Sequence, residues 1–67
     1  MNLQRLRRER GLSQEQLAHL ADCPRAYLSG AEAGRRNPTL KTIAALAHAL
    51  DVDPADLLKE EQQTSIK

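Results

Sequence analysis

The chain has 67 residues, of which 40% are hydrophobic and 28% charged, a balance typical of one small globular domain. Its apolar runs are too short to cross a membrane and its N-terminus lacks the apolar stretch of a secretion signal, so we expect a cytoplasmic protein. The single cysteine, Cys23, cannot form an internal disulfide. A domain this short buries only about 60% of its unfolded surface, so its stability margin is small and dimerisation is expected.

The net charge of +1 conceals an asymmetry between the two ends of the chain. Residues 1–41 contain eight Arg or Lys against four Asp or Glu, whereas residues 42–67 contain two against five. One end of the molecule could therefore face phosphate groups while the other faces away. A solvated surface with randomly scattered charge explains the same numbers equally well, so charge alone does not identify the partner.

The apolar pattern predicts helices and no strand, because β-branched residues are few and nothing alternates with a period of two. The expected helices span about residues 2–10, 14–21, 24–33, 40–50 and 54–58. The remaining residues, 59–67, form a polar tail that we expect to fray. We therefore predict an all-α domain over residues 1–58.

Individual residues mark the helix ends. Ser13 and Gln16 have the spacing of a capping box at the start of the second helix, and Pro24 fits the first position of the third. Thr39 is expected to cap the fourth helix. That helix has the clearest apolar stripe, which comprises Leu40, Ile43, Leu46, Ala47 and Leu50.

Two short helices joined by a tight turn, residues 14–33, have the dimensions of a helix-turn-helix, whose second helix enters the major groove of DNA. Ala18 lies where the helices cross closely, and Leu28 and Ala31 are expected to face the core. The residues left on the outward face of the third helix are Arg25, Ala26, Ser29 and Gly30.

In these stretches the sequence resembles the Xre and Cro/C1-type family of bacterial and phage helix-turn-helix regulators. The matching segments are LSQEQLA (12–18), YLS (27–29), EAGRRNPTL (32–40) and LAHAL (46–50). The resemblance implies a compact five-helix, lambda-repressor-like fold that binds specific DNA sequences through helices two and three. The family's turn commonly has Gly and Val where this chain has Asp22 and Cys23, but Asp tolerates a positive φ, so we expect the turn to be kept.

The resemblance also implies two phosphate contacts. Gln14, together with Ser13 before it, matches the family's position at the N-terminus of the second helix, where free amides and the helix dipole favour an anion. The second phosphate clamp of the family corresponds to Arg35, Arg36 and Asn37, with the amides of their loop.

On the third helix, Arg25 either pairs bidentately with guanine or reaches a phosphate without reading sequence. Ala26 and Ser29 suit a thymine methyl and a non-selective hydrogen bond, and Gly30 offers no side chain. Tyr27 is expected to pack at the edge of the core with its hydroxyl near a phosphate. With only one strong base reader, shape readout is expected to carry much of the specificity.

Arg7 and Glu32 occupy positions that form a partly buried ion pair in family members such as the lambdoid repressors. An Arg suits this role because its planar fork can satisfy a carboxylate bidentately. The alternative is that Arg7 is one more exposed base in the arginine-rich first helix.

An enzyme or metal protein is not expected, because His19 and His48 lie on different helices without further ligands and no glycine-rich phosphate loop is present. We likewise expect no cofactor, membrane partner or small-molecule ligand.

The function we predict is a transcription regulator, of the kind seen in phage Cro/repressor proteins and restriction-modification controllers, that binds double-stranded DNA at an inverted-repeat operator as a homodimer. The dimer contact is expected at Val52, Leu57 and Leu58, since helix four already fills the small core. The alternative is an antitoxin or protein-interaction module with the same fold.

Overall fold

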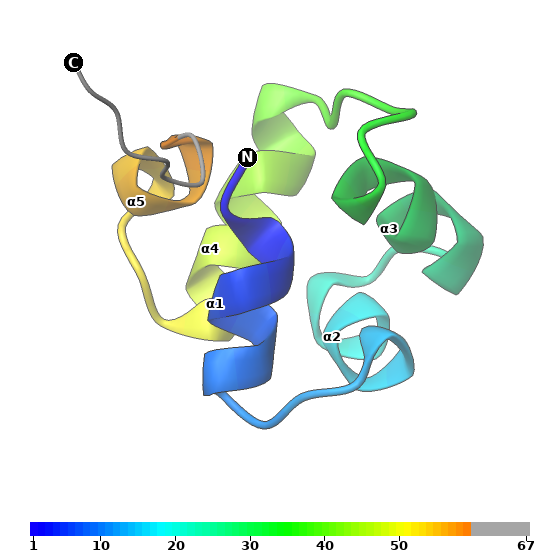
Figure 1. The fold of residues 1–67 in the computed structure, drawn as a ribbon, viewed down its shortest axis with the longest axis horizontal. Coiled ribbons are helices and arrows are strands. Elements are labelled where there is room, and N and C mark those ends of the chain that lie inside the picture. Colours follow the sequence, from blue (N-terminus) through cyan, green and yellow to red (C-terminus); the bar gives the residue numbers. More distant parts are fainter. Residues whose placement is uncertain (60–67) are drawn as a thin grey trace, which may run out of the picture.

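The computed structural model describes residues 1–59 and contains five helices in that range. They are α1 (Leu3–Glu9), α2 (Gln14–Ala21), α3 (Arg25–Glu32), α4 (Leu40–Leu50) and α5 (Pro54–Leu58). Figure 1 shows α1 and α4 in the middle of the molecule, α2 and α3 on one side and α5 on the other. The prediction of an all-α, five-helix fold is confirmed. Apart from Lys59, the predicted polar tail lies outside the described residues.

The helices begin where local capping signals place them. Ser13 Oγ accepts from the Gln16 amide at 3.0 Å while Gln16 Oε1 accepts from the Ser13 amide at 2.8 Å, which completes the predicted capping box. Thr39 Oγ1 accepts from the Thr42 amide at 3.2 Å, and the Asp53 carboxylate accepts from a first-turn amide of α5 at 2.8 Å. None of the helices within residues 1–59 combines the length and apolarity that a membrane span requires.

Pro24 precedes α3 and is not its first residue, which corrects the predicted helix start. Its backbone is extended, with φ −65° and ψ 144°, and α3 begins at Arg25. The Pro24 carbonyl accepts the Leu28 amide at 3.2 Å, so Pro24 has the N-cap position. The extended conformation carries the chain out of the turn at Asp22, which is left-handed with φ 57° as expected.

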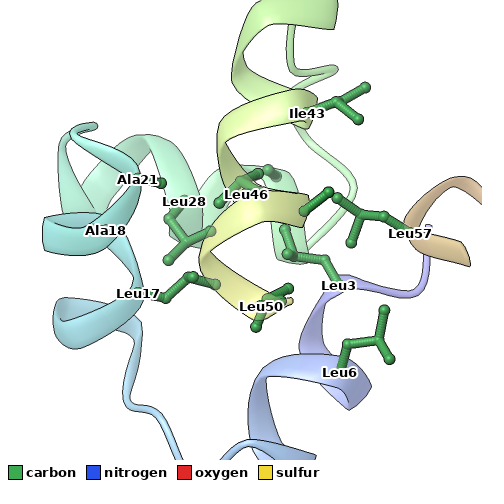
Figure 2. Close-up of a cluster of buried hydrophobic side chains, with 12 residues drawn as sticks. Leu3, Leu6, Leu17, Ala18, Ala21, Leu28, Ile43, Leu46, Leu50 and Leu57 are labelled. Carbon is green, nitrogen blue, oxygen red and sulfur yellow. The ribbon is translucent and has the colours of Figure 1, made fainter. Parts of the chain in front are cut away.

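The core consists of side chains from all five helices, and Figure 2 shows its leucines pointing toward one another. The six largest side chains with under 2% exposure are Leu3, Leu17, Leu28, Leu46, Leu50 and Leu57. The predicted α4 stripe is wrong at one position, since Leu40 is 82% exposed whereas Ile43 is 7% exposed. Leu40 is the first residue of α4, one turn before the part of the helix that its neighbours cover.

The predicted dimer contact is wrong for Leu57, which is 0% exposed and belongs to the core. The reason is that α5 is drawn back against the start of α1. The Asn2 amide donates to the Leu57 carbonyl at 3.0 Å, and Asn2 Nδ2 donates to the Asp56 carbonyl at 3.4 Å. Leu58, the next residue along, is 51% exposed, and Val52 is partly buried against the core.

Candidate nucleic-acid interface

The turn between α2 and α3 fixes the angle of the second helix. The Cys23 amide donates to the Ala18 carbonyl at 3.0 Å, across the left-handed residue Asp22. Ala18 is 3% exposed and Leu28, on α3, is fully buried, so the inner face of α3 packs against α2, which in turn packs on α4. This packing leaves the opposite face of α3 toward the surface, where Arg25 and Ala26 are exposed and Ser29 is partly buried.

Gly30 is buried, although the sequence places it on the outward face of α3. The aliphatic stem of Arg36 covers it: a Cβ at Gly30 would lie 3.1 Å from Arg36 Cδ and 3.2 Å from Cγ. The prediction of an open surface at Gly30 is therefore corrected. The loop after α3 returns across the helix and occupies the space that a side chain would fill.

The loop after α3 exposes its side chains to solvent, whereas two of its amides form hydrogen bonds within the domain. Arg35, Arg36 and Asn37 are all exposed. The amides of Arg35 and Arg36 donate to the Gly30 carbonyl at 2.8 and 3.2 Å, so they are not free to hold a phosphate as expected. The Arg36 guanidinium carbon lies 5.6 Å from the ring centroid of Tyr27, which is partly buried.

Arg7 and Glu32 lie together in the structure. Arg7 Nε is 2.5 Å from Glu32 Oε2 and Nη2 is 3.1 Å from Oε1, a bidentate arrangement between α1 and α3. The two side chains are 9% and 3% exposed. Arg7 Nη1 also donates to the Leu12 carbonyl at 2.7 Å, so one guanidinium joins α1, the following loop and α3.

Gln14 is partly buried and its side chain faces the same carboxylate, with Gln14 Nε2 3.1 Å from Glu32 Oε1. Burial by itself raises the pKa of Glu32, but the hydrogen bonds from Arg7 and Gln14 and the positive charges of Arg7 and Arg8 outweigh it. The pKa of Glu32 therefore lies below its ordinary value. Sequence reasoning missed the bond between Gln14 and Glu32, because no local signal joins residues eighteen positions apart.

Two other groups of residues bear on chemistry. Within residues 1–59, no three His, Cys, Asp or Glu side chains gather where they could hold a metal ion. Burial, followed by the charge of Asp22, raises the pKa of Cys23, which disfavours the reactive thiolate. Cys23 is partly buried, whereas the arginines near α3 are exposed, namely Arg25, Arg35 and Arg36.

A turn-linked pair of helices with the second one outward and arginines beside it defines a helix-turn-helix DNA-binding domain. The helix-turn-helix family model matches residues 3–57, and the chain belongs to this family of transcriptional regulators, whose members bind DNA and are not enzymes. The chain is 44% identical over 63 residues to y4dJ, an uncharacterised HTH-type transcriptional regulator of Sinorhizobium fredii. That match covers 94% of this chain and 82% of that protein.

The domain is similar to several solved structures. The restriction-modification controller protein C.AhdI from Aeromonas hydrophila matches with a TM-score of 0.83 and 47% identity, over 85% of this chain and 86% of that chain. The N-terminal DNA-binding domain of SinR from Bacillus subtilis matches with a TM-score of 0.84 and 30% identity, over 92% of this chain and 91% of that chain. The resemblance to Cro/C1-type regulators stated from the sequence is confirmed.

Proposed function

We propose that this regulator binds an inverted-repeat operator as a homodimer, with α3 of each copy in the major groove of one half-site. The observation that carries the proposal is the placement of α3 and α5 on opposite sides of the molecule (Figure 1). Exposed arginines accompany α3, whereas α5 carries the exposed Leu58. One side therefore suits DNA and the other suits a second copy.

In this proposal Arg25 reads a base, because it is the first residue of α3 and its side chain is exposed. Ala26 and Ser29 lie beside it and add contacts of low selectivity. Tyr27 lies under the Arg36 guanidinium, and its hydroxyl is the group that would contact a phosphate.

The phosphate contacts we propose come from two loops that flank the helix-turn-helix. At the start of α2 they are Ser13 and Gln14, and after α3 they are the side chains of Arg35, Arg36 and Asn37. Such contacts set the register of α3 in the groove without reading sequence. Deformability of the operator then contributes specificity at positions that no side chain touches.

For the dimer we retain Leu58 and Val52 and omit the buried Leu57. Isologous pairing through this side would separate the two α3 helices by about one turn of DNA, roughly 34 Å. The similarity to the restriction-modification controller protein C.AhdI supports a controlling role, which an operator-bound dimer would exert by occupying its site.

The test is selection of bound duplexes from a random double-stranded DNA pool by the purified protein. We expect enrichment of an inverted repeat whose half-sites are centred about 10 base pairs apart. Enrichment of a single asymmetric half-site would contradict the homodimer mode. No enrichment at all would contradict operator binding and favour the alternative, a protein-interaction module such as an antitoxin.

A further inference from the structure

Gly30 and Tyr27 are three residues apart on α3 and so lie on the same side of the helix, beside the face of Arg25, Ala26 and Ser29 that is proposed to approach DNA. Arg36, from the loop that follows, lies across both of them. Its Cγ and Cδ pass over Gly30, and its guanidinium lies over the Tyr27 ring at 5.6 Å. Arg36, six residues after Gly30, thus supplies the positive charge on this part of α3.

The position of Arg36 depends on the missing side chain at Gly30. A Cβ there would lie 3.1 Å from Arg36 Cδ and 3.2 Å from Cγ, tighter than ordinary van der Waals contact. The amides of Arg35 and Arg36 donate to the Gly30 carbonyl, so the loop backbone is tied to the same residue and cannot easily withdraw. An added methyl group would therefore displace the Arg36 side chain and not the loop.

We propose that Gly30 is a positioning residue for Arg36: by lacking a Cβ it lets the Arg36 stem lie flat on α3 and holds the guanidinium against Tyr27 before DNA arrives. This inference rests on the proposed function, in which Arg36 contacts DNA. An arginine in solution samples many rotamers, and fixing it beforehand lowers the entropy lost on binding.

The test is a double-mutant cycle with Gly30→Ala and Arg36→Ala, measured on the duplex selected by the wild-type protein. Gly30→Ala should fold with an unchanged or higher urea midpoint, because Ala is favoured over Gly inside a helix. Its affinity for the duplex should fall between about two-fold and about ten-fold, the range for losing one pre-ordered side chain. In the Arg36→Ala background the same substitution should leave the affinity unchanged.

An equal loss in both backgrounds would mean that the alanine methyl obstructs DNA directly, and this result would overturn the inference. An unchanged affinity of Gly30→Ala in the wild-type background would overturn it as well. If Arg36→Ala binds the selected duplex as tightly as the wild type, the DNA role proposed for Arg36 fails.

A measurement without DNA separates the two failures. In the NMR spectrum of the free protein, the Arg36 side-chain protons near the guanidinium should be shifted by the Tyr27 ring. Gly30→Ala should move these shifts toward those of Tyr27→Leu, which lacks the ring. Identical Arg36 shifts in the wild type and Gly30→Ala would overturn the positioning role, whatever the protein binds.

Discussion

The side-chain amide of Gln14 donates to the Glu32 carboxylate at 3.1 Å and so joins the first residue of α2 to the last residue of α3. The same carboxylate accepts two hydrogen bonds from Arg7. The residue proposed to hold a phosphate at the start of α2 is therefore oriented by the ion pair that connects α1 with the recognition helix. Removing Glu32 should affect both the stability of the fold and the order of Gln14.

We expect Glu32→Ala to lower the free energy of unfolding by on the order of 3–5 kcal/mol, because it leaves the buried Arg7 charge unpaired. Urea unfolding of the purified variant measures this loss. The matched control is Glu9→Ala, which breaks the exposed pair of Arg5 with Glu9 and should cost less than about 1 kcal/mol. A loss below about 0.5 kcal/mol for Glu32→Ala, the scale of an exposed pair, would contradict the structural role.

Acid should weaken the same pair. The folded-state pKa of Glu32 is lowered, so its contribution to stability is complete above the unfolded pKa, about 4.3, and is lost as the pH falls through the folded value. Urea midpoints measured from about pH 6 to about pH 3 should therefore fall more steeply for the wild type than for Glu32→Gln, which cannot titrate. Parallel curves for the two proteins would show that Glu32 does not contribute to the acid dependence.

Arg25 and Arg35 should differ in the kind of affinity they contribute. Arg25→Ala is expected to cost about 1–3 kcal/mol mainly at one base position of the selected duplex. Arg35→Ala should weaken selected and random duplexes alike and reduce the slope of log affinity against log salt by about 0.9. Titrations over a salt series with both duplexes separate the two effects. Equal losses on all sequences for Arg25→Ala would assign Arg25 to a phosphate.

Leu58→Asp should convert the proposed dimer into a monomer, because an isologous interface brings the new carboxylates of both copies close together. Leu20→Asp is the matched control, since Leu20 is 57% exposed on α2 and Leu58 is 51% exposed on α5. Sedimentation at micromolar concentration should show a dimer for the wild type and for Leu20→Asp. A wild-type monomer, or a dimeric Leu58→Asp protein, would argue against this interface.

Glycine at position 22 should stabilise the turn of the helix-turn-helix more than the native Asp22 does. Asp22 has φ 57°, a region where glycine avoids a steric cost, so Asp22→Gly should raise the free energy of unfolding by about 0.5–1 kcal/mol. Asp22→Ala should lower it, because alanine lacks glycine's freedom and tolerates a positive φ less well than Asp does. Thermal or urea unfolding of both variants decides the point, and a loss of stability for Asp22→Gly would show that the Asp side chain stabilises the turn.

Much of the fold could be predicted because its signals are local. The side chains of Ser13 and Thr39 accept hydrogen bonds from amides three residues away, so both helix starts are marked within one turn. The resemblance to the family then supplied the pairing of Arg7 with Glu32, which no local pattern indicates. Each of these predictions therefore depends on residues close together in the sequence or on a pairing that the family resemblance implies.

The wrong predictions concern residues whose surroundings come from elsewhere in the chain. Leu57 is buried because α5 is bonded to Asn2, at the other end of the domain. Gly30 is covered because a loop folds back over α3. Leu40 continues the apolar period of α4 but lies beyond the helices that would cover it. Hydrophobic periodicity shows which face of a helix is apolar and not how far along it the neighbours reach.

The hydrogen bonds between Asn2 and α5 couple local unfolding of the domain to its proposed dimerisation. Asn2 is 4% exposed and its backbone and side chain bond to consecutive carbonyls, those of Leu57 and Asp56. Any fluctuation that frees Asn2 also frees the helix that carries Leu58. If the two copies associate through that helix, each copy stabilises the hydrogen bonds of Asn2 in the other. Hydrogen exchange at the Asn2 amide should then become slower as the protein concentration rises.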